Sequence, residues 1–329
     1  ISYTLDAEGN RLSQTVNGVT TTFSYNADDQ LLSTSGGFNN SYTYNANGEQ
    51  VSRVLNGVSY TLSWDYDGQL VGISGKGSVV TFSYDALGRR VSRTVNGTPC
   101  QLVHDGDRII LERQGGTVTA VYSYGNALIA RNGEVVLPDG LGTTRAIVNS
   151  LQALTSTLTT EAFGNTVAQW GGSGNPYRFA GAWGYRDDGD AGLLHVGARY
   201  YDPQVGRFIS RDAVLSEHPY LYCEHEPVNH VDPSGRIWGR LVIWVIGSFA
   251  GKISEYLGVD PEYTWPIEHF AGEVGDDLMN EVGLPGFGSA FGAATTFIGG
   301  MDALADGVKV VVKYRLRVED YMDENGRWD

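Results

Sequence analysis

The side chains best suited to bind a metal ion lie together near residue 220. Cys223, His225 and His230 follow a Cys-x-His-x4-His spacing, and His218 precedes the cysteine by five residues. Thiolate and imidazole groups are the usual zinc ligands, but structural zinc sites bring them in pairs only about two to five residues apart. This stretch lacks such paired spacing. We therefore predict that it holds no metal ion.

The two cysteines of the chain, Cys100 and Cys223, lie far apart in the sequence. Two cysteines are too few for the disulfide framework of a small secreted domain. A single bridge between them is compatible with the sequence.

Residues 236–329 carry no recognisable catalytic or nucleotide-binding motif. They contain no glycine loop that would cradle a phosphate, no nucleophile elbow and no dinucleotide fingerprint, so we predict no cofactor. Acidic residues outnumber basic ones there, and His269 is the only histidine. The whole chain has a formal net charge of −15. Because such a surface repels phosphate backbones, we predict that nucleic acid is not a partner.

A run of twenty uncharged residues, 282–301, has the length of a membrane span. Gly288 and Gly292 have the spacing of a helix-packing motif. Several glycines and a proline make the run a poor hydrophobic span, however. We interpret it as a glycine-rich segment packed against aromatic residues, with membrane contact as the alternative.

The elements that position these residues begin with a repeat of about twenty residues. Nineteen residues separate Tyr25 from Tyr44, and forty separate Tyr44 from Tyr84. This period is short for a helical repeat and is typical of β-hairpins, which must stack to bury their apolar faces. The copies start at Tyr3, Tyr25, Tyr44, Asp65 and Tyr84.

Within each copy, apolar and polar residues alternate as in a strand with one buried face. Asn-Gly pairs follow, and this pair tolerates the positive φ of tight hairpin turns. They occur at Asn17-Gly18, Asn47-Gly48, Asn56-Gly57 and Asn96-Gly97. We expect strands, not helices, at Phe23, Tyr25, Tyr44, Trp64, Phe82 and Tyr84.

The stretch from Ala198 to Asp212 reads Ala-Arg-Tyr-Tyr-Asp-Pro-Gln-Val-Gly-Arg-Phe-Ile-Ser-Arg-Asp, and Asp232-Pro233-Ser234-Gly235 follows. Together they resemble the core sequence of the Rhs/YD-repeat family. This family includes bacterial polymorphic toxins, Tc toxin C components and, more distantly, animal teneurins. The resemblance implies a mainly β fold, a spiral shell of β-hairpin repeats with a small, partly helical C-terminal segment.

Three parts follow from this resemblance. Residues 1–130 are the hairpin repeats, residues 131–235 are the Rhs-associated core, and residues 236–329 are the variable C-terminal segment, a candidate toxin. The chain begins at Ile1 in mid-repeat without a signal peptide. We expect a secreted or cell-surface protein that is exported through an upstream region.

The resemblance also implies self-cleavage at the end of the core by an aspartic-protease-like pair. Asp212 and Asp232 match the two aspartates of the family, and Arg199 matches a core arginine that orients a carboxylate or holds the developing oxyanion. The bond expected to break is Arg236–Ile237. We expect the three side chains to approach one another in an enclosed space.

Two departures from the family pattern weigh against cleavage. The Pro-x-Gly expected after Asp212 is absent, and Arg236 replaces an apolar residue at the cleavage position. The alternative is that Asp202, Asp212 and Asp232 only hydrogen-bond their own turns, so that the core closes the shell and the chain stays intact.

The function implied by the resemblance is a shell that encapsulates and presents its own C-terminal segment in bacterial competition or toxin delivery. The implied partners are that segment, an immunity protein and a secretion-system or upstream shell component. The alternative is a structural or adhesive surface protein whose C-terminal plug is inactive.

Overall fold

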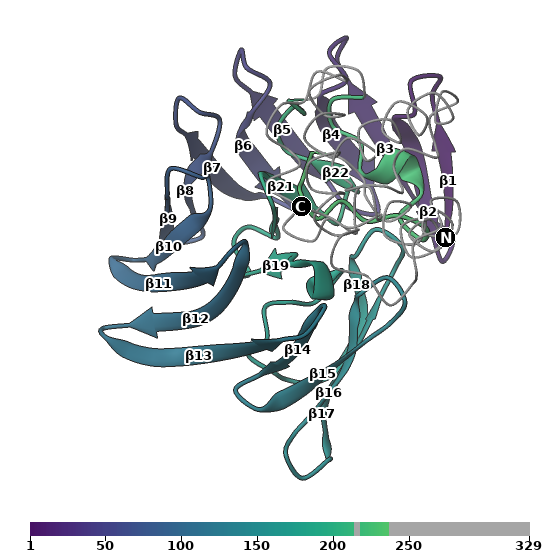
Figure 1. The fold of residues 1–329 in the computed structure, drawn as a ribbon. Coiled ribbons are helices and arrows are strands. Elements are labelled where there is room, and N and C mark those ends of the chain that lie inside the picture. The colour runs from purple at the N-terminus through teal and green to yellow at the C-terminus, as the bar shows by residue number, and fades with distance from the viewer. Residues whose placement is uncertain (214–217, 237–329) are drawn as a thin grey trace, which may run out of the picture. The chain divides into compact units, whose positions relative to one another are not determined.

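A computed structural model describes residues 1–213 and 218–236. The chain divides into two compact units, residues 1–238 and 239–329, and the described residues all belong to the first. Eighteen strands of this unit form one large antiparallel sheet in which each strand pairs with the next along the chain (Figure 1). A second sheet of four short strands follows. This order is a long hairpin array followed by a small core sheet.

The strands of the large sheet are β1 (Ser2–Leu5), β2 (Arg11–Val16), β3 (Val19–Tyr25), β4 (Leu31–Gly36), β5 (Asn40–Tyr44), β6 (Gln50–Leu55), β7 (Val58–Trp64), β8 (Leu70–Gly75), β9 (Ser78–Tyr84), β10 (Arg90–Val95), β11 (Thr98–Asp105), β12 (Arg108–Gln114), β13 (Thr117–Tyr124), β14 (Leu128–Arg131), β15 (Glu134–Pro138), β16 (Thr144–Val148), β17 (Leu154–Thr160) and β18 (Thr166–Gly171). The remaining elements are β19 (Arg186–Asp187), β20 (Leu194–Val196), β21 (Arg199–Asp202), β22 (Arg207–Phe208) and the short 3₁₀ helices η1 (Gly181–Trp183) and η2 (Cys223–His225).

Asn-Gly pairs form the tight turns at one end of the hairpins. Both residues of Asn17-Gly18 have positive φ, 50° and 81°, and Asn56-Gly57 and Asn96-Gly97 do the same. Two successive left-handed residues match the right-handed twist of the flanking strands, which is why asparagine and glycine occur there. At Asn47-Gly48 only the glycine has positive φ. That pair therefore belongs to a different turn.

The turns at the other end share one arrangement. Asp65 accepts the backbone N–H groups of Asp67 at 3.0 Å and Gln69 at 2.8 Å through its side-chain oxygen. The same two hydrogen bonds recur wherever this aspartate or asparagine recurs, because the side chain replaces a missing backbone acceptor. The equivalent residues are Asp6, Asn26, Asn45, Asp85, Asp139 and Asn149.

At several repeats, the aromatic residue before this turn is hydrogen-bonded to the beginning of the preceding strand. The Tyr84 hydroxyl donates to the carbonyl oxygen of Leu70 at 2.7 Å, and Tyr25 donates to that of Arg11 at 3.0 Å. The indole N–H of Trp64 donates to the carbonyl oxygen of Gln50 at 2.8 Å. An aromatic side chain with a polar tip satisfies both needs of this position, an apolar body inside and a hydrogen bond at its end.

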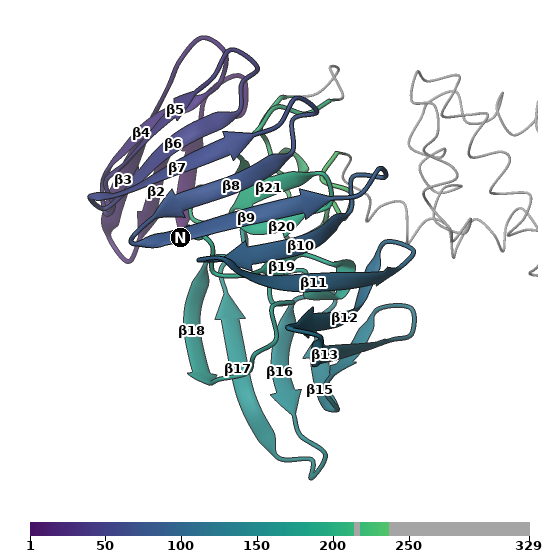
Figure 2. The same ribbon diagram turned by 90° about the vertical axis from the view of Figure 1, so that its left-hand side faces the viewer.

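The large sheet curls so that its inner face surrounds the small sheet (Figures 1 and 2). Buried side chains of β7 to β9 pack with Tyr200 and Ile209, and those of β3 to β5 pack with Val205. The two ends of the array meet where the rings of Tyr3 and Phe163 pack edge to face, with their centroids 5.6 Å apart. The chain that carries β19 to β22, which we call the core chain, therefore fills the inner side of the curled sheet.

The predicted fold is confirmed for the part of the chain that the structure describes. Every aromatic residue expected on a strand lies on β3, β5, β7 or β9. The expected partly helical segment and the run 282–301 lie outside the described residues. Within the described ranges, no helix has the length and apolarity needed to span a membrane.

Candidate functional site

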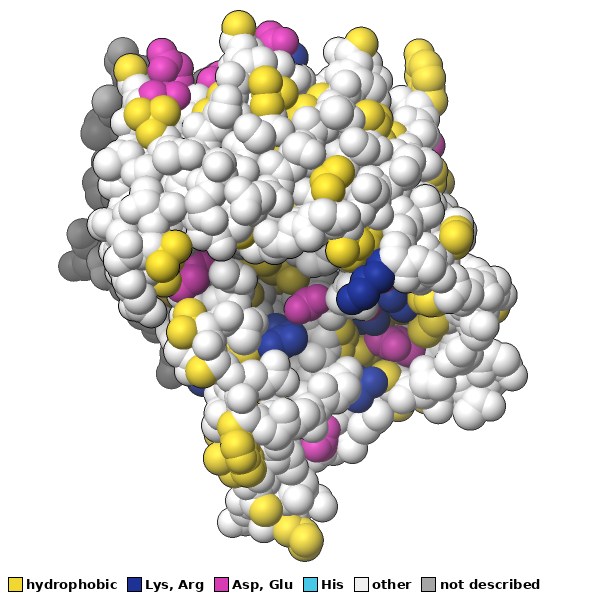
Figure 3. Space-filling model, turned by 180° about the vertical axis from the view of Figure 1, so that it is seen from behind, with side chains coloured by type: hydrophobic (Ala, Val, Ile, Leu, Met, Phe, Trp, Pro, Cys, Tyr) yellow, Lys and Arg dark blue, Asp and Glu magenta, His cyan; other side chains and the backbone are white. Residues whose placement is uncertain are grey.

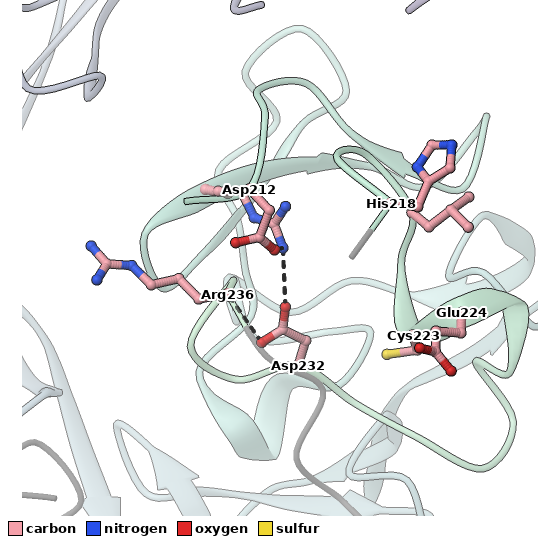
Figure 4. Close-up of a pocket in the computed structure, with 8 residues that line it drawn as sticks. Asp212, His218, Cys223, Glu224, Asp232 and Arg236 are labelled. Atoms are coloured by element: carbon pink, nitrogen blue, oxygen red, sulfur yellow. Dashed lines mark hydrogen bonds and ion pairs between the residues drawn. The ribbon is translucent and has the colours of Figure 1, made fainter. Parts of the chain in front are cut away.

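A small cavity lies where the core chain ends (Figure 4). Its volume is about 20 Å³, which is room for about one water molecule. The described residues that line it are Arg199, Asp212, His218, Leu221, Cys223, Glu224, Asp232 and Arg236. Three of them are the residues that the sequence analysis selected for hydrolysis.

Arg199 enters this site from the first position of β21, whose four residues are all buried. Its guanidinium carbon lies 3.6 Å from the ring centroid of Phe208 on β22. An aromatic face attracts a cation and holds the planar group in one orientation. The small sheet therefore holds the guanidinium group of Arg199 through a contact that involves neither aspartate.

Both aspartates meet the same atom of this arginine. Nη2 of Arg199 lies 2.6 Å from Oδ2 of Asp212 and 3.4 Å from Oδ2 of Asp232. These side chains are no more than 6% exposed. The structure thus brings together the three residues expected at the site, although their catalytic role stays a prediction.

Burial changes the acidity of two of these groups. It raises the pKa of Asp232 above its ordinary value, because a charged carboxylate loses its hydration, while Arg199 opposes the shift. Burial likewise lowers the pKa of Arg199, against the attraction of Asp212 and Asp232. Buried Asp232 is therefore more easily protonated than a solvent-exposed aspartate.

Asp232 sits in a turn like those of the repeats. Its Oδ1 accepts the backbone N–H of Arg236 at 3.2 Å and the hydroxyl of Ser234 at 2.9 Å. Gly235 closes the turn with a φ of 66°, and a Cβ there would overlap the carbonyl oxygen of Val196. Only glycine fits both constraints. The Asp-Pro-Ser-Gly sequence therefore seats the end of the core against the small sheet.

One peptide group at this turn faces the site. The Nε of Arg199 donates to the carbonyl oxygen of Gly235, and the next N–H, that of Arg236, points at Asp232. The Arg236 side chain is exposed and extends away from the two carboxylates (Figure 4). The charge of Arg236, at the position where the family pattern has an apolar residue, therefore lies away from the two carboxylates. Ile237, the second residue of the bond predicted to break, lies outside the described residues.

The four potential metal ligands have separate neighbours. His218 Nε2 lies 3.1 Å from Oδ1 of Asn10, His225 Nε2 contacts the carbonyl oxygen of Gly9, and His230 Nδ1 lies 3.7 Å from Glu226. Cys223 is buried and, like Cys100, a free cysteine, so no bridge joins the two. Nowhere in residues 1–213 and 218–236 do three such side chains form a metal-binding group.

Two supporting residues were missed by the sequence analysis. The hydroxyl of buried Tyr185 accepts the backbone N–H of Asp232 at 2.7 Å, and Ser234 contacts the carboxylate itself. Ser234 occupies the variable position of Asp-Pro-x-Gly, and Tyr185 lies 47 residues upstream. The turn around Asp232 was the only sequence signal for Ser234, and Tyr185 carried none.

A curled array of hairpins, closed on its inner side by a core chain that ends at an arginine and two aspartates, defines a repeat-shell protein. The sequence profile of the teneurin YD-shell family matches residues 1–221. The chain belongs to this family. The match confirms the family resemblance that the sequence around Arg199 indicated.

Relatives with known names match parts of the chain. Salivary gland surface protein 1 of Aedes aegypti is 29% identical over 191 residues, which is 53% of this chain and 5% of that protein. Toxin protein Tse5 of Pseudomonas aeruginosa is 36% identical over 80 residues, or 23% of this chain and 6% of that protein. The chain thus spans about a twentieth of these relatives.

A solved structure of the Photorhabdus luminescens Tc holotoxin pore is also similar. It aligns with a TM-score of 0.44 and 16% identity, covering 71% of this chain and 16% of that one. The family model is what shows that the protein is a YD-shell protein, and the toxin Tse5 is a relative of part of the chain.

Proposed function

We propose that this protein is part of a shell that encloses and presents its own C-terminal segment, residues 236–329, for toxin delivery, and that it cuts itself at the end of the core. The observation that carries the proposal is the contact of Arg199 with Asp212, Asp232 and the Gly235 carbonyl. This buried group of charges lies directly beside the point where the described core ends. The toxin Tse5, a relative, supports delivery.

The proposed chemistry is hydrolysis of one peptide bond. Asp212 accepts a proton from a water molecule in the cavity, the water oxygen bonds to the carbonyl carbon, and Arg199 stabilises the charge that develops on the carbonyl oxygen. Protonated Asp232 then gives its proton to the leaving amide nitrogen as the C–N bond breaks. The products are a new carboxylate and a new amine.

The contacts favour a bond one residue earlier than the sequence pattern does. Arg199 engages the carbonyl of Gly235, and Asp232 engages the N–H of Arg236, so the polarised bond is Gly235–Arg236. The sequence pattern predicts Arg236–Ile237. The N-terminal residue of the released fragment distinguishes the two bonds.

Intact-mass spectrometry of the purified protein tests self-cleavage. We expect a C-terminal fragment that begins at Arg236 or Ile237 and disappears in Asp212→Asn and Asp232→Asn, because an amide neither accepts nor shares the required proton. Asp65→Asn is the matched control, since asparagine already serves the equivalent turns at Asn26 and Asn45. An unbroken wild-type chain would overturn self-cleavage.

Encapsulation and toxicity need a separate test. Expression of residues 236–329 alone should slow bacterial growth more than expression of the full chain, and a neighbouring immunity protein should restore growth. Equal growth in all three cases contradicts a toxic segment.

A second function is a surface or adhesive protein whose core only closes the shell. The likeness to a salivary gland surface protein favours it, as does the charge compensation of both aspartates by Arg199. An intact chain with a harmless C-terminal segment is the result expected from this alternative.

A further inference from the structure

A second and much larger cavity opens on the other side of the shell. Its volume is about 430 Å³, within the range of cavities that take small ligands. Strands β10, β12, β14 and β16 to β18 line it together with residues 173–178 and 186–189. Figure 3 shows this hollow from behind, with basic and acidic side chains on its walls. It shares no lining residue with the cavity at Asp232.

Most charges on these walls neutralise one another. Arg186 is held by Glu112 at 2.8 Å and by Asp188 at 2.9 Å. Arg93 donates to Asp190 at 2.7 Å. The charges of these two guanidinium groups are compensated by carboxylates, although Nη1 of Arg186 is buried without a hydrogen-bond partner.

Arg131 is different. Its Nε donates to the Tyr122 hydroxyl at 3.4 Å, and its guanidinium carbon lies 5.9 Å from the Tyr122 ring centroid. Among the described residues, no carboxylate forms an ion pair with it, and its one side-chain hydrogen bond is that to Tyr122. The cavity therefore presents one uncompensated cation in a protein whose net charge is −15.

The backbone leaves space for this guanidinium at Gly174. A Cβ at that position would lie 2.9 Å from Nη1 of Arg131, closer than side chains normally approach. Arg178, which lines the same cavity, has its nearest carboxylate, that of Asp187, at 3.7 Å. The cavity walls thus carry Arg131 and a second, weakly paired arginine.

The wall chemistry selects the ligand. One free guanidinium matches one carboxylate, which it binds through two parallel hydrogen bonds. Glu112 and Asp188 are paired with Arg186, and Asp187 lies near Arg178, so the walls accommodate one ligand carboxylate, whereas each further negative charge on a ligand would be repelled by these three carboxylates. The remaining polar groups suit the N–H and C=O groups of a peptide backbone, and they belong to Thr144, Ser156, Thr157, Gln169, Ser173 and Asn175.

We propose that this cavity binds a short peptide that carries a single carboxylate side chain, and that Arg131 holds this carboxylate. The site is separate from the residues proposed for self-cleavage, so either proposal can fail without the other.

Calorimetric titration of the full chain with the N-acetylated and C-terminally amidated tripeptide Gly-Glu-Gly, which carries one carboxylate, tests the site. We expect saturable binding that Arg131→Gln weakens at least tenfold, because a charge-assisted bidentate contact is lost. Gly174→Ala should also weaken it, by crowding Nη1 without removing a charge. Arg113→Gln, which removes an exposed arginine of β12 outside the cavity, should leave the affinity unchanged.

Three results would overturn the proposal. They are absence of saturable binding, an equal effect of Arg113→Gln and Arg131→Gln, and equal affinity for the capped tripeptide Gly-Gln-Gly or for inorganic phosphate. Thermal unfolding of each variant identifies any loss that comes from misfolding, and in that event the Gly174→Ala result decides.

Discussion

Arg53 on β6 and Asp202 on β21 form an ion pair whose two side chains are only 1% and 2% exposed. The partners are 149 residues apart in the sequence and join the hairpin array to the core sheet. Asp202 also accepts the backbone N–H of Gln204 at 2.9 Å. Its role is therefore structural, whereas Asp212 and Asp232 surround Arg199.

Removal of one member of this pair should be costly. Arg53→Ala leaves a buried carboxylate without its cation, and we expect it to lower the free energy of unfolding by about 3–5 kcal/mol. Urea denaturation measures the change. Arg89→Ala, which removes a solvent-accessible i,i+4 pair with Asp85, should cost much less, because solvent screens that pair. Similar losses in the two variants would contradict the structural role of burial here.

The tyrosine contact between successive hairpins predicts a smaller effect. Tyr84→Phe keeps the ring and removes the hydrogen bond to Leu70, so it should lower the free energy of unfolding by about 1 kcal/mol. Tyr66→Phe is the control, because Tyr66 is fully exposed. Urea denaturation of both variants gives the comparison. Equal stability of the two would show that the hydroxyl contributes nothing.

The repeated turn predicts which substitutions the shell tolerates. Asp65→Ala removes the acceptor for two backbone N–H groups and should cost about 1–2 kcal/mol. Asp65→Asn should be nearly neutral, since Asn26 and Asn45 make the same two hydrogen bonds. Thermal unfolding ranks the variants. A destabilised Asp65→Asn would mean that the negative charge matters more than the acceptor.

His225 predicts a dependence of stability on pH. Burial lowers the pKa of this imidazole to about 4, while the unfolded chain titrates near 6.5. The unfolded state therefore binds more protons between these values, so stability is full above pH 6.5 and falls as the pH drops towards 4.

Replacement by glutamine isolates this contribution. His225→Gln keeps a donor for the Gly9 carbonyl but cannot titrate, and it should flatten the loss between pH 6.5 and 4 by about 2 kcal/mol. Denaturation at a series of pH values measures the slope. Identical slopes in variant and wild type would exclude His225 as the titrating group.

Local patterns were sufficient to predict the hairpins. Alternation around Phe23 and the Asn56-Gly57 pair each depend on a few neighbouring residues, so their structure follows from sequence directly. Asn47-Gly48 was the exception, because the neighbouring Asn45 imposes the other kind of turn.

The candidate site was predictable only in part. The resemblance supplied Arg199, Asp212 and Asp232, and the structure brings them together. The contact of Arg199 with the Gly235 carbonyl depends on how the core chain returns to β21, and no sequence period encodes that return. The cavity at Arg131 escaped prediction for the same reason, since its walls come from strands scattered between Arg93 and Asp188.

The hydrogen bonds from Tyr25, Trp64 and Tyr84 to the first residue of the preceding strand have a consequence for how such chains change length over evolution. Because the tie spans fourteen residues, as from Tyr84 to Leu70, a whole unit of about twenty residues can be duplicated or deleted while every remaining unit keeps a predecessor of the same kind. Contacts such as Arg53 with Asp202 belong to particular units and do not shift with them. The number of hairpins that precede such units in the sequence is therefore free to vary. The hairpins whose side chains contact the core sheet, such as the one that carries Arg53, are fixed in number and order.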